Sequence, residues 1–175
     1  MIISRTWAMP SHATFSIPPI TDLLQRYLGG WPPESVIVDP FARESRYGTI
    51  TNDLDPTSPA EYHMEATDFC TLLTVQGTKA GAVLFDPPYS PRQISEMYKR
   101  VGLAIGMQGT QNGRLYKAVR DGLDQLLLPG GLAISCGWNS AGFGKERGYV
   151  CLEILLVAHG GAHNDTIVVV EQKGV

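Results

Sequence analysis

The sequence contains no long apolar run and few cysteines. No stretch approaches the roughly 20 consecutive apolar residues that a membrane-spanning helix needs. The three cysteines, Cys70, Cys136 and Cys151, are widely spaced and form no C-x-x-C pair. We therefore expect free, buried thiols in a reducing compartment and no disulfide framework. The N-terminus also lacks the charged region and the long apolar region of a secretory signal, so we expect a cytoplasmic protein.

An excess of positive charge is missing as well. The net charge is −3 at pH 7, which counts mildly against nucleic-acid binding, because phosphate contacts usually come with a basic domain. The basic side chains are unevenly distributed, however, and several of them gather in one segment: Arg92, Lys99, Arg100, Arg114, Lys117 and Arg120. Solvated helix faces explain this grouping about as well as a phosphate-facing edge does.

The composition is that of an ordinary folded domain. The chain has 175 residues, of which 43% are hydrophobic and 18% charged, and it contains no internal repeat or low-complexity tract. A chain of this length can bury a large core without disulfides or structural metal. Residues 1–175 are therefore expected to form a single domain.

Strands and helices alternate along most of the chain. Apolar runs that end at a turn signal predict strands over residues 35–38, 48–53, 80–85 and 132–136. Apolar residues at helical spacing, bounded by turn signals, predict helices over residues 21–28, 91–100 and 115–128, and the same spacing within residues 59–76 predicts a helix that follows a turn at Asp68. Thr21 is the expected N-cap of the first of these helices, and a sharp turn is expected at Pro129-Gly130-Gly131. The alternation implies an α/β fold with a mostly parallel, doubly wound sheet.

The C-terminal third has a different pattern. Two apolar runs, residues 150–157 and 166–170, are separated by a turn of Gly, His and Asn residues with no room for a helix. They predict an antiparallel hairpin. Its last strand is expected to be the one antiparallel strand, at the edge of the sheet.

The most informative segment follows the strand expected over residues 80–85, and consists of Asp86, Pro87, Pro88 and Tyr89. The carboxyl end of a strand in an open α/β sheet is where ligands bind. Two prolines in a row remove two backbone donors and fix two φ angles, which makes the segment stiff. Such a unit can hold a planar amino group between a carboxylate, a proline carbonyl and an aromatic ring. The alternative is a plain strand end followed by a proline turn.

Acidic residues recur at the same edge. Asp39 and Asp53 end the strands expected over residues 35–38 and 48–53, and Asp68 lies before the strand that leads to Asp86. Any one of these acids alone is more typical of a turn or a helix N-cap. Their shared placement favours a nucleoside-bearing ligand, with Asp53 accepting from ribose hydroxyls and Asp68 accepting from an adenine amine beside the Phe69 ring.

On these residues the chain resembles the class I S-adenosylmethionine-dependent methyltransferases, and more closely their DNA adenine-N6 members. The segments similar to family motifs are Thr14-Phe15-Ser16-Ile17, Asp39-Pro40-Phe41, Asp53, Asp68-Phe69 and Asp86-Pro87-Pro88-Tyr89. The resemblance covers nearly the whole chain, and its C-terminal hairpin is similar to the one that ends the family's seven-stranded, Rossmann-like sheet. The amino-acid sequences of residues 7–10, 39–43 and 51–54 also resemble those of small phage-borne adenine methylases.

The resemblance implies a reaction and a set of ligands. S-adenosylmethionine would be the methyl donor, without a metal, and the substrate would be an adenine flipped out of DNA. Asp86 and the Pro87 carbonyl would accept hydrogen bonds from its amine while Tyr89 stacks on the ring. Cofactor contacts would come from residues 14–17, 39–41, Asp53, Asp68 and Phe69. The setting would be the cytoplasm of a bacterium or of a phage-infected host.

The chain departs from the family pattern at two positions. The family usually has glycines where this chain has Arg43 and Ser45. Side chains there limit how closely the methionine end of the cofactor can pass. Arg43 could pair with the cofactor's carboxylate, or it could face solvent.

Target recognition has little protein available, because no separate recognition region is present. Only residues 90–128 and 138–149 are left for it, so either recognition is short or a second subunit supplies contacts, as in a homodimer. The glycine-rich segment over residues 138–145 could cover the site or contact DNA, and a plain connection explains it equally well. His159 and His163 suggest a metal site, but without a third ligand we interpret them as turn residues.

Three classes of function stay open from the sequence. The favoured one is a DNA adenine-N6 methyltransferase. The second is a methyltransferase for another exocyclic amine, such as cytosine N4 or a base in RNA. The third is a non-catalytic protein that kept the fold. This hypothesis is motivated by Arg43 and Ser45 in place of glycines and by the acidic character of the chain.

Overall fold

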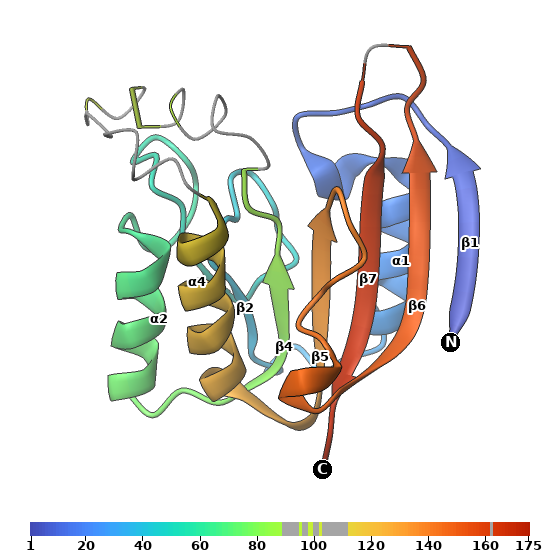
Figure 1. The fold of residues 1–175 in the computed structure, drawn as a ribbon. Helices are drawn as coiled ribbons and strands as arrows, with labels where there is room; N and C mark the ends of the chain where they lie inside the picture. Colours follow the sequence, from blue (N-terminus) through green and yellow to red (C-terminus); the bar gives the residue numbers. More distant parts are fainter. Residues whose placement is uncertain (89–94, 96–97, 100–101, 103–111, 162) are drawn as a thin grey trace.

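The computed structural model describes residues 1–88, 95, 98–99, 102, 112–161 and 163–175, and of residues 112–115 only the backbone (Figure 1). Tyr89 and most of the helix expected over residues 91–100 therefore lie outside the described residues. Within them the chain forms one seven-stranded sheet, in the order β1-β6-β7-β5-β4-β2-β3. The strands are β1 (Ile2–Trp7), β2 (Ile37–Asp39), β3 (Ile50–Thr51), β4 (Ala80–Phe85), β5 (Leu127–Gly137), β6 (Tyr149–Ala158) and β7 (Thr166–Lys173).

The sheet is mostly parallel, as predicted. Strand β4 pairs in parallel with β2 and β5, and β2 pairs in parallel with β3. Only β7 runs the other way, antiparallel to both β5 and β6, which confirms the C-terminal hairpin. The predicted α/β, Rossmann-like sheet with seven strands is confirmed.

The prediction that the antiparallel strand lies at the edge is wrong. Strand β7 lies between β5 and β6, and the edge beside β6 is formed by β1, which pairs with it in parallel. The sequence pattern did not reveal β1 because an edge strand with one solvated face lacks a buried apolar run. Ile2 and Ile3 are 59% and 68% exposed, and the strand has no fully buried residue.

Helices cover both faces of the sheet, as expected. Helix α1 (Pro18–Leu28) lies behind the sheet in Figure 1, and α2 (Ala66–Val75) and α4 (Asn112–Leu126) lie in front of it. The apolar side chains of α1 pack on Ala82 and Leu84 of β4. The neighbouring residues of β4, Val83 and Phe85, point to the other face and pack with α2 and α4. Because β4 is buried on both faces, its carboxyl end is held from two sides.

The predicted N-cap of α1 is wrong. The helix begins at Pro18, with prolines in its first turn, where the fixed φ angle fits a helix and the missing N–H costs nothing. Thr21 lies inside the helix, and its hydroxyl donates to the carbonyl of Phe15 at 2.7 Å. This bond fixes the preceding 3-10 turn, η1 (Thr14–Ser16), against the helix.

The sharp turn predicted at residues 129–131 is also wrong, because these residues belong to β5. Ala80 pairs with Leu127 and Ala82 with Leu132, so the intervening residues of β5 form an irregular bulge opposite a single residue of β4. Gly130 supplies the positive φ, 77°, that this bulge requires.

The three cysteines are free thiols. Cys70 and Cys136 are buried, as expected, and Cys151 is half-buried. Burial raises the pKa of Cys70 to about 12, so this thiol stays protonated at neutral pH. Among the described residues no helix has both the length and the apolar character that crossing a lipid bilayer requires.

Candidate functional site

Three of the predicted acids meet at one edge of the sheet. Val38 of β2 pairs with Val83 of β4, so the residues that follow these strands emerge side by side. Asp39, Asp53 and Asp86 are all buried, with exposed fractions of 0%, 8% and 5%. Burying a charged carboxylate costs free energy unless it is hydrogen-bonded or paired with a positive charge. The structure thus brings these three predicted site residues together.

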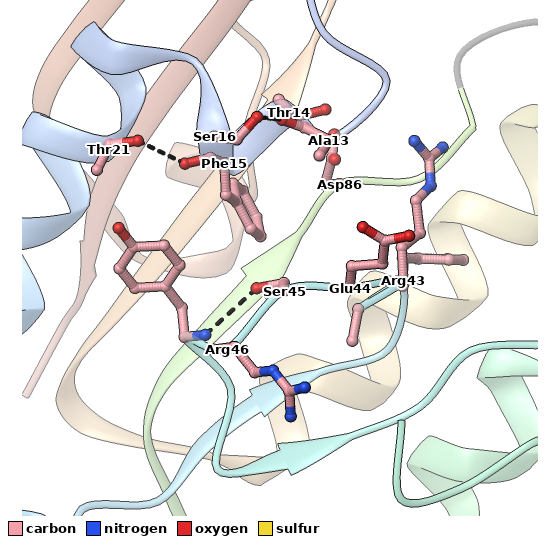
Figure 2. Close-up of a pocket in the computed structure, with 13 residues that line it drawn as sticks. Ala13, Thr14, Phe15, Ser16, Thr21, Arg43, Glu44, Ser45, Arg46 and Asp86 are labelled. Atoms are coloured by element: carbon pink, nitrogen blue, oxygen red, sulfur yellow. Dashed lines mark hydrogen bonds between the residues drawn. The ribbon is translucent and has the colours of Figure 1, made fainter. Parts of the chain in front are cut away.

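A cavity of about 360 Å³ opens at this edge. Figure 2 shows its three walls: the segment around η1, the loop that follows β2, and Asp86 after β4. The residues that line it are Ala13, Thr14, Phe15, Ser16, Thr21, Phe41, Ala42, Arg43, Glu44, Ser45, Arg46, Tyr47 and Asp86. Its volume lies in the range of sites for small molecules and cofactors.

The η1 wall contains most of the N-terminal motif that the sequence singled out. Thr14 and Phe15 are buried, and the Phe15 ring contacts the edge of Tyr47 across the cavity, with centroids 6.1 Å apart. Ser16 donates from its hydroxyl to the Ala13 carbonyl at 2.7 Å. Ile17 is only 2% exposed and lies in the core beneath, so it supports this wall from outside the cavity.

The loop after β2 places Arg43 in the wall of the cavity. Arg43 has a φ of 49°, in the left-handed region, and it is the only non-glycine residue with a positive φ among the described residues. Its backbone N–H donates to Asp53 at 3.0 Å, and its guanidinium donates to the carbonyl of His12. Arg43 therefore ties this loop to the segment that precedes η1.

Asp39 anchors the start of the same loop. One of its oxygens accepts the N–H of Phe41 at 3.1 Å, and the other has no hydrogen-bond partner among the described residues. Burial raises the pKa of Asp39 to about 8; the hydrogen bond from Phe41 acts to lower this pKa, and the neighbouring charges of Asp86 and Asp53 act to raise it. At neutral pH Asp39 is therefore largely a neutral carboxylic acid.

A second, small cavity of about 20 Å³ lies on the other side of Phe41. Its walls include Pro40, Asp53 and Pro88, together with Glu65 and Tyr98. The Tyr98 hydroxyl donates to the Glu65 carboxylate at 2.7 Å. Glu65 and Tyr98 were not predicted from the sequence, because only tertiary structure brings them to Asp53. The one available signal was the position of Glu65 at the N-cap of α2, three residues before Asp68.

Asn52 holds the two sides of this small cavity together. Its amide donates to the carbonyls of Pro40 and Met64 and its oxygen accepts the N–H of Met64, all within 3.1 Å. Asp53 next to it accepts N–H groups from Arg43 and Asp55. Each oxygen of a carboxylate can accept a second hydrogen bond, so Asp53 still has capacity for a ligand.

The other predicted cofactor residues lie outside both cavities. Asp68 is exposed on the first turn of α2, and Phe69 is fully buried in the core, with its ring 5.4 Å from that of Tyr62. Their roles at an adenine ring stay predictions. Pro87 and Pro88 are buried beside Asp86, and the Tyr116 hydroxyl donates to the Pro88 carbonyl.

The segment over residues 138–148 is anchored away from both cavities. Buried Glu171 accepts the N–H groups of Phe143 and Gly144 at 2.6 and 3.0 Å. Arg147 of the 3-10 turn η2 (Lys145–Arg147) pairs with Asp121 of α4 at 2.6 Å. In its described conformation this segment packs on β7 and α4 and lines neither cavity.

Part of the basic grouping is engaged within the protein. Lys117 pairs with Asp121 at 2.7 Å, and the half-buried Arg120 guanidinium lies over the Phe85 ring. Solvated and packed helix faces thus explain these two side chains without a nucleic acid. Arg92 and Arg100, and the side chain of Arg114, lie outside the described residues.

His159 connects the hairpin to the N-terminal strand. Its two ring nitrogens make hydrogen bonds with the Ala8 carbonyl and the Thr166 hydroxyl, at 2.8 and 2.9 Å. His163 is exposed. Within the described part of the chain no group of His, Cys, Asp and Glu side chains could hold a metal ion.

Comparison with solved structures identifies the fold. No protein-family model and no curated protein matches the sequence. The structure is similar to TrmN from Thermus thermophilus (TM-score 0.55, 18% identity, 90% of this chain and 49% of that one). It is also similar to the N-methyltransferase NodS from Bradyrhizobium japonicum WM9 (0.58, 11%, 90% and 96%) and to NSun6 from Pyrococcus horikoshii (0.57, 14%, 86% and 50%).

NodS has also been crystallised with S-adenosyl-L-homocysteine. The chain spans about half the length of TrmN and of NSun6. At these identities the likeness concerns the fold. The protein therefore has a Rossmann-like fold with an antiparallel C-terminal hairpin, similar to the fold of the N-methyltransferase NodS.

Proposed function

We propose that this chain transfers a methyl group from S-adenosylmethionine to the N6 amine of adenine in DNA. The observation that carries the proposal is the position of Asp86. It lines the larger cavity at the carboxyl end of β4, and two buried prolines follow it. A buried carboxylate beside a stiff proline pair, at the opening of a cofactor-sized cavity, suits a planar amine.

The residues around the two cavities suit the cofactor. The larger cavity presents the guanidinium of Arg43 and the hydroxyls of Thr14 and Ser45, which fit a carboxylate and an ammonium group. The smaller cavity presents the carboxylates of Asp53 and Glu65, which fit ribose hydroxyls. S-adenosyl-L-homocysteine in NodS, which has the same fold, supports S-adenosylmethionine as the methyl donor.

Positioning of the amine is the protein's main contribution. S-adenosylmethionine supplies an electrophilic methyl group bonded to a sulfonium sulfur. Asp86 and the Pro87 carbonyl accept the two N–H groups of the amine, which turns the nitrogen lone pair toward that methyl group, and Tyr89 stacks on the base. Transfer forms a nitrogen–carbon bond, breaks a sulfur–carbon bond and releases one amine proton, for which Asp86 is the nearest acceptor in this scheme.

A covalent protein nucleophile is not required for this chemistry. The thiol of Cys70 is kept protonated by burial, and its pKa is about 12.

The target adenine has to leave the base stack, because its amine cannot be reached inside a duplex. Target recognition would use residues 90–128 and 138–149, and a homodimer would add contacts from a second copy. Sedimentation of the protein with and without a DNA duplex tests the dimer.

The deciding experiment uses labelled S-adenosylmethionine with unmodified DNA and, separately, with RNA, followed by identification of the labelled nucleoside. N6-methyladenine in DNA is the expected product. N4-methylcytosine, or label in RNA alone, would keep the cofactor and change the substrate class. If calorimetry detects no binding of S-adenosylmethionine while circular dichroism shows an intact fold, the chain is a non-catalytic protein with this fold.

A further inference from the structure

Tyr116 contacts the backbone of the proline pair directly. Its side chain extends from α4, and its hydroxyl donates a hydrogen bond to the carbonyl of Pro88. Burial raises the pKa of Tyr116 above its usual value, so the hydroxyl stays protonated and can act as a donor at any ordinary pH.

The Pro88 carbonyl has a special position in the chain. Proline fixes φ at both Pro87 and Pro88 and provides no N–H, so no ladder hydrogen bond from these residues can orient the segment. The orientation of the Pro88 carbonyl then depends mainly on one angle, the ψ of Pro88. The same carbonyl belongs to the planar peptide bond that joins Pro88 to Tyr89. A hydrogen bond to it fixes the plane in which the chain leaves the proline pair.

The residue before Asp86 is held by the same part of α4. The ring of Phe85 meets the edges of the Tyr116 and Phe143 rings, each with centroids 6.1 Å apart. The guanidinium of Arg120 lies 5.6 Å from the centre of the Phe85 ring. Arg120 also donates to the carbonyls of Tyr116 and Gly142, at 3.3 and 2.7 Å. Phe85 and Pro88, on the two sides of Asp86 and Pro87, are thus both tied to α4.

We propose that Tyr116 is a positioning residue for the amine site: by holding the Pro88 carbonyl it orients the two preceding acceptors, Asp86 and the Pro87 carbonyl, toward the amine. This inference rests on the proposed function. Tyr116 touches neither of the two cavities, so the role predicts an effect on transfer and none on cofactor binding. A purely structural tyrosine would instead lower stability and leave the rate of the folded enzyme unchanged.

The test compares Tyr116→Phe with a matched control, Tyr27→Phe. Both changes remove one hydroxyl from a half-buried tyrosine on a helix. Tyr27 lies on α1, on the other face of the sheet, and its hydroxyl donates to Glu153 at 3.1 Å. For Tyr116→Phe we expect kcat to fall about tenfold, the rate equivalent of losing one hydrogen bond. The Kd for S-adenosylmethionine should stay within twofold, and Tyr27→Phe should keep the wild-type kcat.

A second measurement does not depend on activity. In protein labelled with carbon-13 at proline carbonyls, the Pro88 resonance should shift in Tyr116→Phe and stay in place in Tyr27→Phe. An unmoved Pro88 resonance, or a kcat within twofold of wild type, would overturn the positioning role while the proposed function stands. Equal losses of kcat in both variants would also overturn it. A wild-type protein that methylates no amine would overturn the proposed function and, with it, this role.

Discussion

Replacing Asp39 with asparagine should stabilise the protein in a pH-dependent way. Burial raises the pKa of Asp39 from 3.8 in the unfolded chain to about 8. The folded chain therefore binds more protons at Asp39 than the unfolded chain does between these two pH values. The contribution of Asp39 to the free energy of unfolding is greatest below pH 3.8 and falls as the pH rises to 8. At about 1.4 kcal/mol per pH unit, the ceiling on the loss is about 5 kcal/mol near pH 7.5.

The measured loss should be smaller than this ceiling. A buried carboxylate draws in water and relaxes its surroundings, so we expect about 2–3 kcal/mol. Asparagine has nearly the same shape and cannot ionise. Its amide oxygen can accept the Phe41 N–H, and its amide nitrogen takes the place of the oxygen that has no partner among the described residues. Asp39→Asn should thus be more stable than wild type by about 2–3 kcal/mol at pH 7.5 and nearly equal to it at pH 4.

Urea unfolding from pH 4 to pH 8.5 checks this prediction. Asp121→Asn is the control with the opposite sign, because hydrogen bonds from Lys117 and Arg147 lower the pKa of Asp121. Ionised Asp121 stabilises the folded state at a pH above its unfolded pKa, and this contribution is lost as the pH falls. Asp121→Asn should therefore be less stable than wild type at neutral pH. A stability difference between Asp39→Asn and wild type that does not change with pH would refute the electrostatic reasoning.

Three further predictions concern the site and its support. Asp86→Ala should abolish methyl transfer and leave calorimetric binding of S-adenosylmethionine nearly unchanged; a collapse of binding would contradict the division of roles at this edge. Arg43→Gly should relieve about 1 kcal/mol of left-handed strain yet weaken cofactor binding, because the cavity loses one of its two arginines and the loop loses its bond to His12. An unfolding temperature that rises while the Kd increases in calorimetry is the expected pair of results, and an unchanged Kd would remove Arg43 from the cofactor site. Glu171→Ala leaves two N–H groups unsatisfied near Phe143 and should cost at least about 2 kcal/mol in urea unfolding, without a specific change in kcat; a loss under about 0.5 kcal/mol would show that water replaces the carboxylate.

The elements that the sequence predicted well are those that one local pattern determines. Strand β4 spans Ala80–Phe85, as expected, because an unbroken apolar run bounded by Lys79 and Asp86 is compatible with little else. The start of α1 was missed because two signals competed. Thr21 is a good N-cap by type, but Pro18 and Pro19 fit the first turn better.

Contacts between distant segments could not be predicted from the sequence. Glu65 and Tyr98 meet beside Asp53 only because the chain folds back across the end of β3. The hydrogen bond between Tyr116 and the Pro88 carbonyl joins residues 28 positions apart, on different elements. Hydrophobic periodicity and motifs predict at which edge of the sheet the site residues gather, because parallel strands end together. They do not predict which residues of later segments make contacts at that edge.

The departure from the family's glycine pattern has a different meaning in the structure than in the sequence. Position 43 requires a positive φ, which glycine adopts freely and which costs arginine about 1 kcal/mol or more. The loop therefore keeps the backbone conformation that a glycine would allow, and Arg43 still donates its N–H to Asp53. What changes is the side chain, which adds a cation to a cavity that Arg46, Glu44 and Asp86 also line. Strain of this kind persists only where the surrounding contacts hold it in place, and the bond from Arg43 to His12 is one such contact. The arginine at this position is thus compatible with the proposed cofactor site, and the Kd of Arg43→Gly decides whether its guanidinium binds the cofactor's carboxylate.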